Sequence, residues 1–186
     1  MTPRAALLRA VNIVRRNTDG TWDGDMLDGA GFVHNAQQAG AQLAGARALL
    51  AGAGGAGSAI ALALLEAGAQ TLAIHDADTT RRDMLIACLS THYAGRVTAG
   101  TRSTAGYAVV VNATPMGMRA GEPLPLDVDA LDAAMFVGDV ITHPEVTPLL
   151  AAARAAGCNT QTGVDMFRAV LVLMVAFVLA GPQAHA

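Results

Sequence analysis

The sequence predicts an α/β fold built on a doubly wound parallel sheet with helices on both faces. Apolar segments of strand length alternate with longer helical segments from about residue 46 onward. The first of these strands also runs directly into a glycine-rich turn that opens a helix. Because parallel strands need a crossover connection, this alternation is typical of βαβ units.

The first βαβ unit is predicted over residues 47–75. Residues 47–51 form a short apolar run that ends in glycines, as a buried strand does. Residues 56–67 are rich in Ala, Leu and Ile and stop at Gly68, which favours a helix. Residues 71–75 then form the second strand of the unit.

The flanking elements follow from the same patterns. Residues 1–32 are polar and turn-rich and give no clear pattern, whereas residues 32–45 are predicted to be helical with Gly45 as the stop. Beyond the first unit, an amphipathic helix precedes two strands, and two further helices complete the chain. Their predicted ranges are 79–92, 107–112, 135–141, 145–156 and 163–180.

The composition excludes several classes of protein. The chain has 186 residues, a formal charge of -3, 53% apolar residues and 15% charged residues, which argues against disorder. All 12 basic residues are arginine and none are clustered, so a nucleic acid partner and any lysine-based mechanism within this chain are excluded. Cys88 and Cys158 are too few for a disulfide framework or a zinc site, and we expect no metal.

The sequence gives no indication of secretion or membrane insertion. The apolar stretch near Met1 is too short for a signal peptide. The longest apolar run, 169–180, is shorter than the ~20 residues that a membrane helix needs. We therefore expect a cytoplasmic protein with no membrane partner.

The glycine-rich turn after residues 47–51 matches the pattern G-x-G-x-x-G. In this pattern Gly52 permits the tight turn, Gly54 lets the backbone approach a pyrophosphate, and Gly57 lets helix and strand pack closely. The helix that starts here directs its free N–H groups at the phosphates. The candidate cofactor-binding residues of this turn are Gly52, Ala53, Gly54, Gly55, Ala56 and Gly57.

An acidic residue supports dinucleotide binding and bears on the choice of cofactor. Asp76 ends the next predicted strand, about 20 residues after the glycines, where a carboxylate reaches the adenosine ribose. A carboxylate accepts hydrogen bonds from ribose hydroxyls but repels a 2′-phosphate, so we favour NAD over NADP. Arg81 and Arg82 follow closely, and they are either phosphate ligands for NADP or part of a solvated helix face.

Four other segments carry a combination of specific motifs. They are 10–12 (A-V-N), 24–32 (G-D-M-L-D-G-A-G-F), 111–118 (V-N-A-T-P-M-G-M) and 139–149, which ends in T-P-L. Together they resemble the shikimate dehydrogenase family, including its quinate/shikimate members. The family usually has threonine in place of Ile13 and Asn-Thr in place of Met26 and Leu27.

The resemblance implies a particular domain organisation and reaction. Residues 1–31 would be a remnant of the N-terminal substrate domain, 32–162 a Rossmann-like NAD(P)-binding domain, and 163–186 a helix that packs back toward the substrate domain. The reaction would be reversible hydride transfer between a nicotinamide cofactor and the carbonyl of 3-dehydroshikimate or its quinate counterpart. In the family, a Lys–Asp pair contacts the substrate hydroxyls and handles the proton.

The resemblance also assigns the substrate site. Asn12 matches the asparagine that hydrogen-bonds substrate, and Asp28 matches the catalytic aspartate, which also contacts substrate. Asp19 competes for that role because residues 17–20 spell the usual N-T-D-G tetrapeptide. We prefer Asp28, since G-F follows it at the family position and its distances to Asn12 and to the glycine turn fit.

Four further residues are expected at the cofactor. Gly163 matches the family glycine that contacts nicotinamide through its backbone, and Val140 matches a neighbouring contact. Asn112 and Thr114 end a predicted strand at the edge of the sheet where cofactors bind, so we expect them to contact the cofactor or lie near it.

The chain departs from the family pattern at positions that matter for catalysis. The family's lysine and paired serines lie upstream of Asn12, and no such residues precede it here. Thr142 stands in place of a substrate-binding tyrosine, and Val170 in place of a glutamine. Because losing one member of an acid–base pair costs ~10²–10⁴ in rate, we expect an impaired enzyme that resembles the family's divergent, shikimate-dehydrogenase-like branch.

Two other functions stay open, and the last helix leads to a separate prediction about self-association. The chain is either a non-catalytic, dinucleotide-binding remnant or a dehydrogenase for another small substrate, as in the folate-linked dehydrogenases with related cofactor domains. The apolar segment 170–179 is expected to lose part of its cover, which favours homodimers or aggregates.

Overall fold

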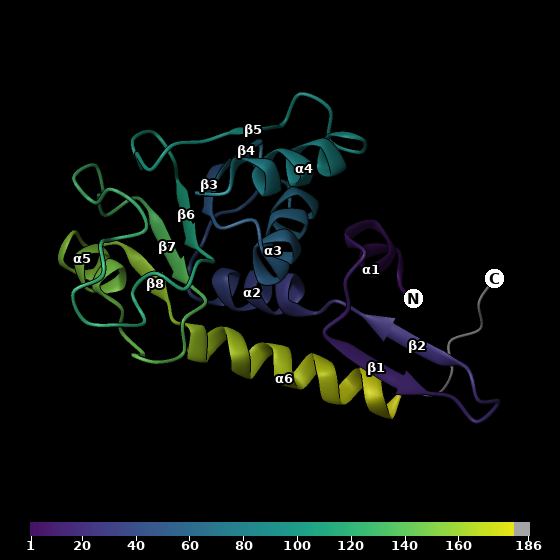
Figure 1. Cartoon of the computed structure of the whole chain (residues 1–186). Coiled ribbons are helices and arrows are strands. Elements are labelled where there is room, and N and C mark those ends of the chain that lie inside the picture. Colours follow the sequence, from purple (N-terminus) through teal and green to yellow (C-terminus); the bar gives the residue numbers. More distant parts are fainter. Residues whose placement is uncertain (181–186) are drawn as a thin grey trace.

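The computed structural model describes residues 1–180, and its central element is a six-stranded parallel sheet (Figure 1). The strand order is β5-β4-β3-β6-β7-β8. The chain therefore starts in the middle at β3, winds outward to β5, and returns to β6 beside β3, which confirms the predicted doubly wound fold. The strands are β3 (Arg47–Ala51), β4 (Thr71–His75), β5 (Val97–Ala99), β6 (Val109–Asn112), β7 (Phe136–Asp139) and β8 (Asn159–Gln161).

Helices cover both faces of this sheet, and the side chains of β3 alternate between two apolar cores. Ala48 and Leu50 belong to the core that includes side chains from α2, α3, α4 and α6. Leu49 and Ala51 face the opposite core, which α5 and the segment before β7 complete. The helices are α2 (Asp28–Gln38), α3 (Gly55–Glu66), α4 (Thr79–Ser90), α5 (Pro148–Ala155) and α6 (Gly163–Leu179).

The polar N-terminal region, where residues 1–32 show no clear sequence pattern, contains regular structure. A short helix, α1 (Pro3–Leu8), leads into an antiparallel hairpin of β1 (Ile13–Arg16) and β2 (Trp22–Asp25). The hairpin lies beside the C-terminal end of α6, at the far end from the large sheet (Figure 1).

Several predicted boundaries shift for local reasons. The helix expected over 32–45 is α2, which ends at Gln38 because Gly40 adopts a φ of +93° in the left-handed region. The helix expected over 145–156 begins later, at Pro148, because Thr147 caps it. The strands expected over 107–112 and 135–141 are shorter, and the three-residue edge strands β5 and β8 were missed.

Two glycines near the start of α2 allow this helix to pack closely against α3 and α6. A Cβ on Gly29 would lie 2.0 Å from the Ala59 carbonyl oxygen in α3. A Cβ on Gly31 would lie 2.3 Å from a Val170 methyl carbon in α6. Since only glycine permits these approaches, the first turn of α2 is held against both helices.

The C-terminal helix is long and apolar on its outer side. α6 has 17 residues, and along residues 1–180 there is no helix long and apolar enough to cross a membrane. Its outward residues include Phe167, Leu171, Val172, Val175, Val178 and Leu179, each about half exposed or more. Residues 181–186 of the predicted C-terminal segment lie outside the described residues.

Candidate functional site

The register of the sheet aligns the carboxyl ends of four strands. His75, Ala51, Asn112 and Asp139 lie in one row across β4, β3, β6 and β7. The residues that follow each strand therefore meet at one edge of the sheet. In open α/β sheets this edge is where ligands bind, at the point where the strand order reverses.

The glycine turn lies at the centre of this edge and needs its glycines. Gly52 has a φ of +100°, and a Cβ there would lie 2.6 Å from the Ala113 carbonyl oxygen. A Cβ on Gly57 would lie 2.0 Å from the Gly52 carbonyl oxygen. The turn is thus pressed against the loop after β6 on one side and against its own helix on the other.

The outer side of the same turn is open. A Cβ on Gly54 or Gly55 would meet no described atom within 4 Å. Gly54 is the N-cap of α3 and makes no side-chain capping hydrogen bond within residues 1–180. The start of α3 is therefore accessible on this side, and the free N–H groups of a helix N-terminus suit an anion such as a diphosphate.

Asp76 fixes the glycine turn from the end of β4. Its carboxylate accepts hydrogen bonds from the Ala53 N–H at 2.7 Å and from the Asp78 N–H at 2.8 Å. It also lines a cavity of about 570 Å³ with residues that follow β4 and β5, including Thr101 and Ser103. Asp76 thus contacts the glycine turn and also lines a cavity that is suitably placed for an adenosine.

The two arginines after Asp76 already have acidic neighbours. Arg81 forms an exposed ion pair with Asp78 at 3.3 Å, and Arg82 forms one with Asp83 at 2.8 Å. Exposed pairs of this kind contribute ~0.2–1 kcal/mol, so they compete only weakly with a bound phosphate.

Asp28 and Asn12, predicted as partners at the substrate, are in direct contact. The Asn12 amide donates to Asp28 Oδ1 at 2.6 Å, and the Asn12 carbonyl oxygen accepts from the Leu27 N–H at 2.9 Å. Burial raises the pKa of Asp28 above its usual value, while the hydrogen bond from Asn12 works in the opposite direction. The site therefore holds a half-buried carboxyl group with an elevated pKa.

A cavity of about 220 Å³ brings five of the predicted site residues together. Asp28, Val140, Thr142 and Gly163 line it, along with Ala56 from the glycine turn. A Cβ on Gly163 would lie 2.3 Å from the Ile141 carbonyl oxygen, which explains a glycine at the start of α6. The remaining lining residues are Met166, Phe167 and Val170 of α6.

The competing carboxylate, Asp19, lies elsewhere. It is exposed in the turn between β1 and β2, and it accepts hydrogen bonds from the N–H and the hydroxyl of Thr21 at 2.9 and 2.7 Å. It does not line the cavity that contains Asp28.

Asn112 is fully buried at the end of β6, and Thr114 follows in the next loop. The Asn112 amide nitrogen donates to both oxygens of Asp139 at 3.2 Å, and its carbonyl oxygen accepts from the Thr114 hydroxyl at 2.7 Å. Asp139 also accepts from the Thr147 hydroxyl at 2.8 Å. The roles of Asp139 and Thr147 were not anticipated, although Thr-Pro is a recognisable helix-start signal.

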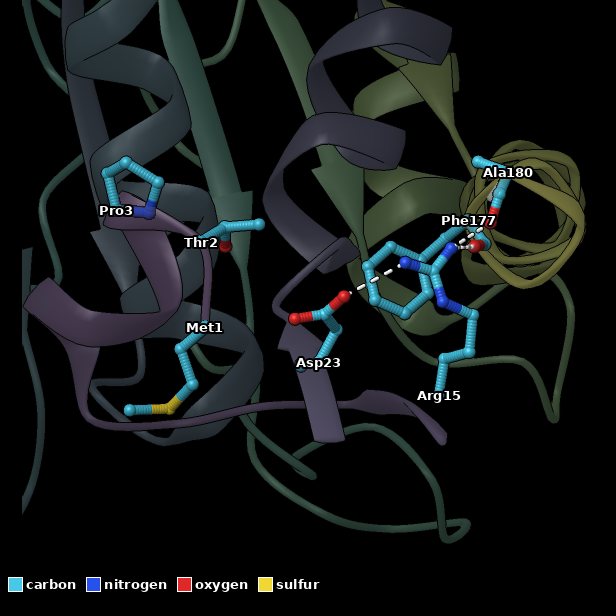
Figure 2. A pocket seen from close by; sticks show the side chains of 8 residues that line it. Met1, Thr2, Pro3, Arg15, Asp23, Phe177 and Ala180 are labelled. Carbon is cyan, nitrogen blue, oxygen red and sulfur yellow. Dashed lines mark hydrogen bonds and ion pairs between the residues drawn. The ribbon is translucent and has the colours of Figure 1, made fainter. Parts of the chain in front are cut away.

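A small cavity of about 130 Å³ lies at the other end of α6 (Figure 2). There Arg15 pairs with Asp23 at 2.9 Å and donates to the carbonyl oxygens of Phe177 and Ala180. Its guanidinium also lies 5.1 Å from the centre of the Phe177 ring. A cation at a helix C-terminus is stabilising, so this cluster fastens α6 to the hairpin.

The sheet order, the glycine turn and the acidic residue after β4 together define a Rossmann-like fold of the dinucleotide-binding class. No family model matches the sequence. Individual proteins do match, beginning with a shikimate dehydrogenase (NADP(+)) of Rhodospirillum rubrum. It is 36% identical over 173 residues, which are 89% of this chain and 61% of that protein.

Solved structures of dehydrogenases and reductases also match this chain. Quinate dehydrogenase from Corynebacterium glutamicum in complex with NAD is 32% identical, with a TM-score of 0.83 over 98% of this chain and 67% of its own. The ligand-free 5-ketofructose reductase of a Gluconobacter strain is 30% identical, with a TM-score of 0.85 over 96% of this chain and 66% of its own. The chain therefore belongs to the shikimate and quinate/shikimate dehydrogenase family, which includes NAD(+) and NADP(+) forms.

The match covers only part of each relative. The chain spans 61% of the Rhodospirillum rubrum protein and 58% of a shikimate dehydrogenase from Rubrobacter xylanophilus.

Proposed function

We propose that this chain is the cofactor-binding part of an NAD-dependent dehydrogenase that transfers hydride between a cyclic polyol carboxylate, of the shikimate or quinate type, and its ketone. One observation carries the proposal. Asp28, held by Asn12, lines the same cavity as Gly163, Val140 and the Ala56 of the glycine turn. A carboxyl group able to exchange a proton thus lies beside the expected nicotinamide position.

The cofactor would extend along the carboxyl edge of the sheet. The open N–H groups at Gly54 and Gly55 support a diphosphate above β3, and Asp76 supports an adenosine ribose beside β4. The nicotinamide would then lie near Gly163 and Val140, while Asn112 and Thr114 hold the intervening loop. When bound, the nicotinamide supplies the hydride acceptor or donor.

NAD is favoured over NADP by the charge at the ribose. Asp76 is tied to the backbone N–H groups of Ala53 and Asp78, so its negative charge stays at the position that a 2′-phosphate would need. The quinate dehydrogenase structure in complex with NAD supports the same preference.

Asp28 would take the hydroxyl proton of the substrate as hydride leaves, and return it in the reverse direction. Its pKa is raised by burial, which makes it a better proton acceptor near neutral pH. Asn12 would orient that carboxyl group and contribute a hydrogen bond to the substrate. Thr142, which lines the same cavity, would contact the substrate hydroxyls.

The rate on shikimate would be low and the best substrate different. Thr142 and Val170 line the cavity where the resemblance implies tyrosine and glutamine. The likeness to 5-ketofructose reductase favours a sugar-derived ketone as another substrate class. Binding of dinucleotide without catalysis is the second candidate, and the apolar Val170 in place of a substrate-binding glutamine favours it.

Residues 1–31 would then be part of the substrate domain, 32–162 the cofactor domain, and 163–186 the segment that returns to the substrate side. A second copy of the chain would cover the outward face of α6 as a homodimer.

The proposal is tested by NAD reduction with shikimate, quinate and sugar-derived polyols, using wild type and Asp28→Asn. We expect slow turnover of at least one polyol, and a ~10²–10⁴-fold loss in Asp28→Asn with NAD affinity unchanged. Asp19→Asn, in the exposed hairpin turn, is the matched control and should retain the full rate. Equal rates in wild type and Asp28→Asn would refute the role of Asp28, and NAD binding without turnover would establish the binding-only function.

A further inference from the structure

Asp139, at the end of β7, is a fully buried carboxylate with no ion-pair partner among residues 1–180. Three groups satisfy it instead. The Ile141 N–H donates at 3.0 Å, the Thr147 hydroxyl at 2.8 Å, and the Asn112 amide at 3.2 Å. Because an unpaired buried charge is costly, a carboxylate that is kept in such a place needs all of these donors.

Asp139 joins two segments of the chain through these hydrogen bonds. The first segment is the loop that follows β6. Asn112 donates to the Met116 carbonyl oxygen at 3.2 Å and accepts from the Thr114 N–H at 3.0 Å. The Thr114 hydroxyl in turn accepts from the Met116 N–H at 3.1 Å. The same loop presses Ala113 against the glycine turn at Gly52. The hydrogen bonds of Asn112 therefore shape the part of this loop that follows Ala113.

The second segment runs from Val140 to Thr147. It contributes Val140 and Thr142 to the cavity that contains Asp28. The carbonyl oxygens of Val140 and Ile141 also lie against the start of α6 at Gly163. Asp139 anchors this segment at both ends, through the Ile141 N–H near its start and the Thr147 hydroxyl at its end.

We propose that Asp139 is a positioning residue, which locks the loop after β6 and the loop after β7 in one arrangement and so shapes the nicotinamide half of the cofactor site. This inference rests on the proposed function for the identity of the ligand. It assigns no direct contact to Asp139, which acts through Asn112, Ile141 and Thr147. The adenosine half is built by Asp76 after β4 and by residues that follow β5, and Asp139 makes no hydrogen bond to any of them among residues 1–180.

The first test compares NAD with ADP-ribose, which lacks only the nicotinamide, by calorimetric titration of the whole chain. Asp139→Asn is expected to weaken NAD binding about tenfold, the effect of losing one charge-assisted hydrogen bond, and to change ADP-ribose binding less than about twofold. Equal weakening of both ligands, or no weakening of NAD, would overturn the proposal, since a general loss of structure does not distinguish the two ligands.

The second test needs no ligand. Hydrogen exchange of the cofactor-free protein should be faster in both loops, 113–117 and 140–147, in Asp139→Asn and in Thr147→Val. Thr147→Ser, which keeps the hydroxyl, is the matched control and should exchange as wild type does. Unchanged exchange, or a change in one loop alone, would contradict the lock. If wild type binds neither NAD nor ADP-ribose, the proposed function fails, and this measurement still decides whether Asp139 couples the loops.

Discussion

The carboxyl group of Asp28, the proposed proton acceptor, carries a cost to stability. Burial raises its pKa, so the native state favours the protonated form more than the unfolded chain does. The stabilising contribution of such a group is complete below the usual pKa of about 3.9 for an aspartate and is lost as the pH rises through the raised value. At neutral pH the ionised carboxylate is therefore a net penalty for folding.

Asp28→Asn should consequently leave the protein as stable as wild type, or more so, at pH 7. Its oxygen still accepts the hydrogen bond from Asn12, and the penalty of the buried charge is removed. Thermal melts at pH 7 and near pH 4 should show an advantage for the variant that shrinks as the pH falls. A variant that melts well below wild type at pH 7 would contradict the sign of this effect.

A single residue is expected to set the cofactor preference. Asp76→Asn removes the negative charge beside the ribose and keeps one oxygen for the Ala53 N–H. The ratio of NADP to NAD affinity should rise about tenfold, the consequence of relieving ~1.4 kcal/mol of repulsion. Asp129→Asn, at an exposed carboxylate that does not line the cavity beside Asp76, is the matched control for titration with both cofactors. An unchanged ratio in Asp76→Asn would show that another group discriminates.

At this scale the resemblance to a known family, and not periodicity, singled out the residues of the substrate site. Asp28 and Asn12 were expected at one site, and the structure brings them into contact across the hairpin. The Asp139 network was not anticipated as a network, because its hydrogen bonds join strands β6 and β7 with the cap of α5. No periodicity or spacing in a single sequence encodes such a contact.

At the scale of elements, α2 is the part most tightly fitted to its neighbours. Gly29→Ala would drive a methyl group into the Ala59 carbonyl oxygen, 2.0 Å away, and push α2 off α3. We expect a loss of ~1–3 kcal/mol in the free energy of unfolding, measured with denaturant. Gly55→Ala is the matched control, because its Cβ meets open space and alanine favours a helix. Equal stability of the two variants would contradict the close packing.

The predicted bounds of the strands agree with the structure where the apolar sequence patterns are strong. β3 and β4 begin and end as the sequence indicated, because each is buried on both sides and bounded by turns. The hairpin had no such pattern, since Asp23 and Asp25 are buried in it. These carboxylates are satisfied by Arg15 and Arg4 (Figure 2 shows the Arg15 pair), so polar residues fill positions that apolar ones usually hold.

At the scale of the whole molecule, the outward face of α6 carries six exposed large apolar side chains. Leu171, Val172 and Val175 are about half exposed or more, and the run 169–180 contains no charge. Surfaces of this kind mark contacts with other proteins. A second copy of the chain offers the same apolar, uncharged face, so a two-fold contact would meet no electrostatic repulsion.

Light scattering should therefore show dimers or larger species for wild type. Val172→Glu places a charge in the middle of this face and should shift the protein toward the monomer. Met84→Glu, at an equally exposed methionine on α4, is the matched control and should not change the mass. A monomeric wild type would rule out association through α6.

The proposed cofactor site extends along the sheet edge from Asp76 after β4 to Gly163 at the start of α6, and the glycine turn lies between them. The most direct measurement is a calorimetric titration of wild type and Gly54→Asp with NAD. Gly54 has ordinary backbone angles and open surroundings, and aspartate is a favoured N-cap, so the variant should melt no lower than wild type. Its charge would lie where the diphosphate is expected. We predict saturable binding of NAD to wild type and at least about a tenfold loss of affinity in the variant. No binding to wild type, or equal binding to both proteins, would contradict a dinucleotide site at this turn.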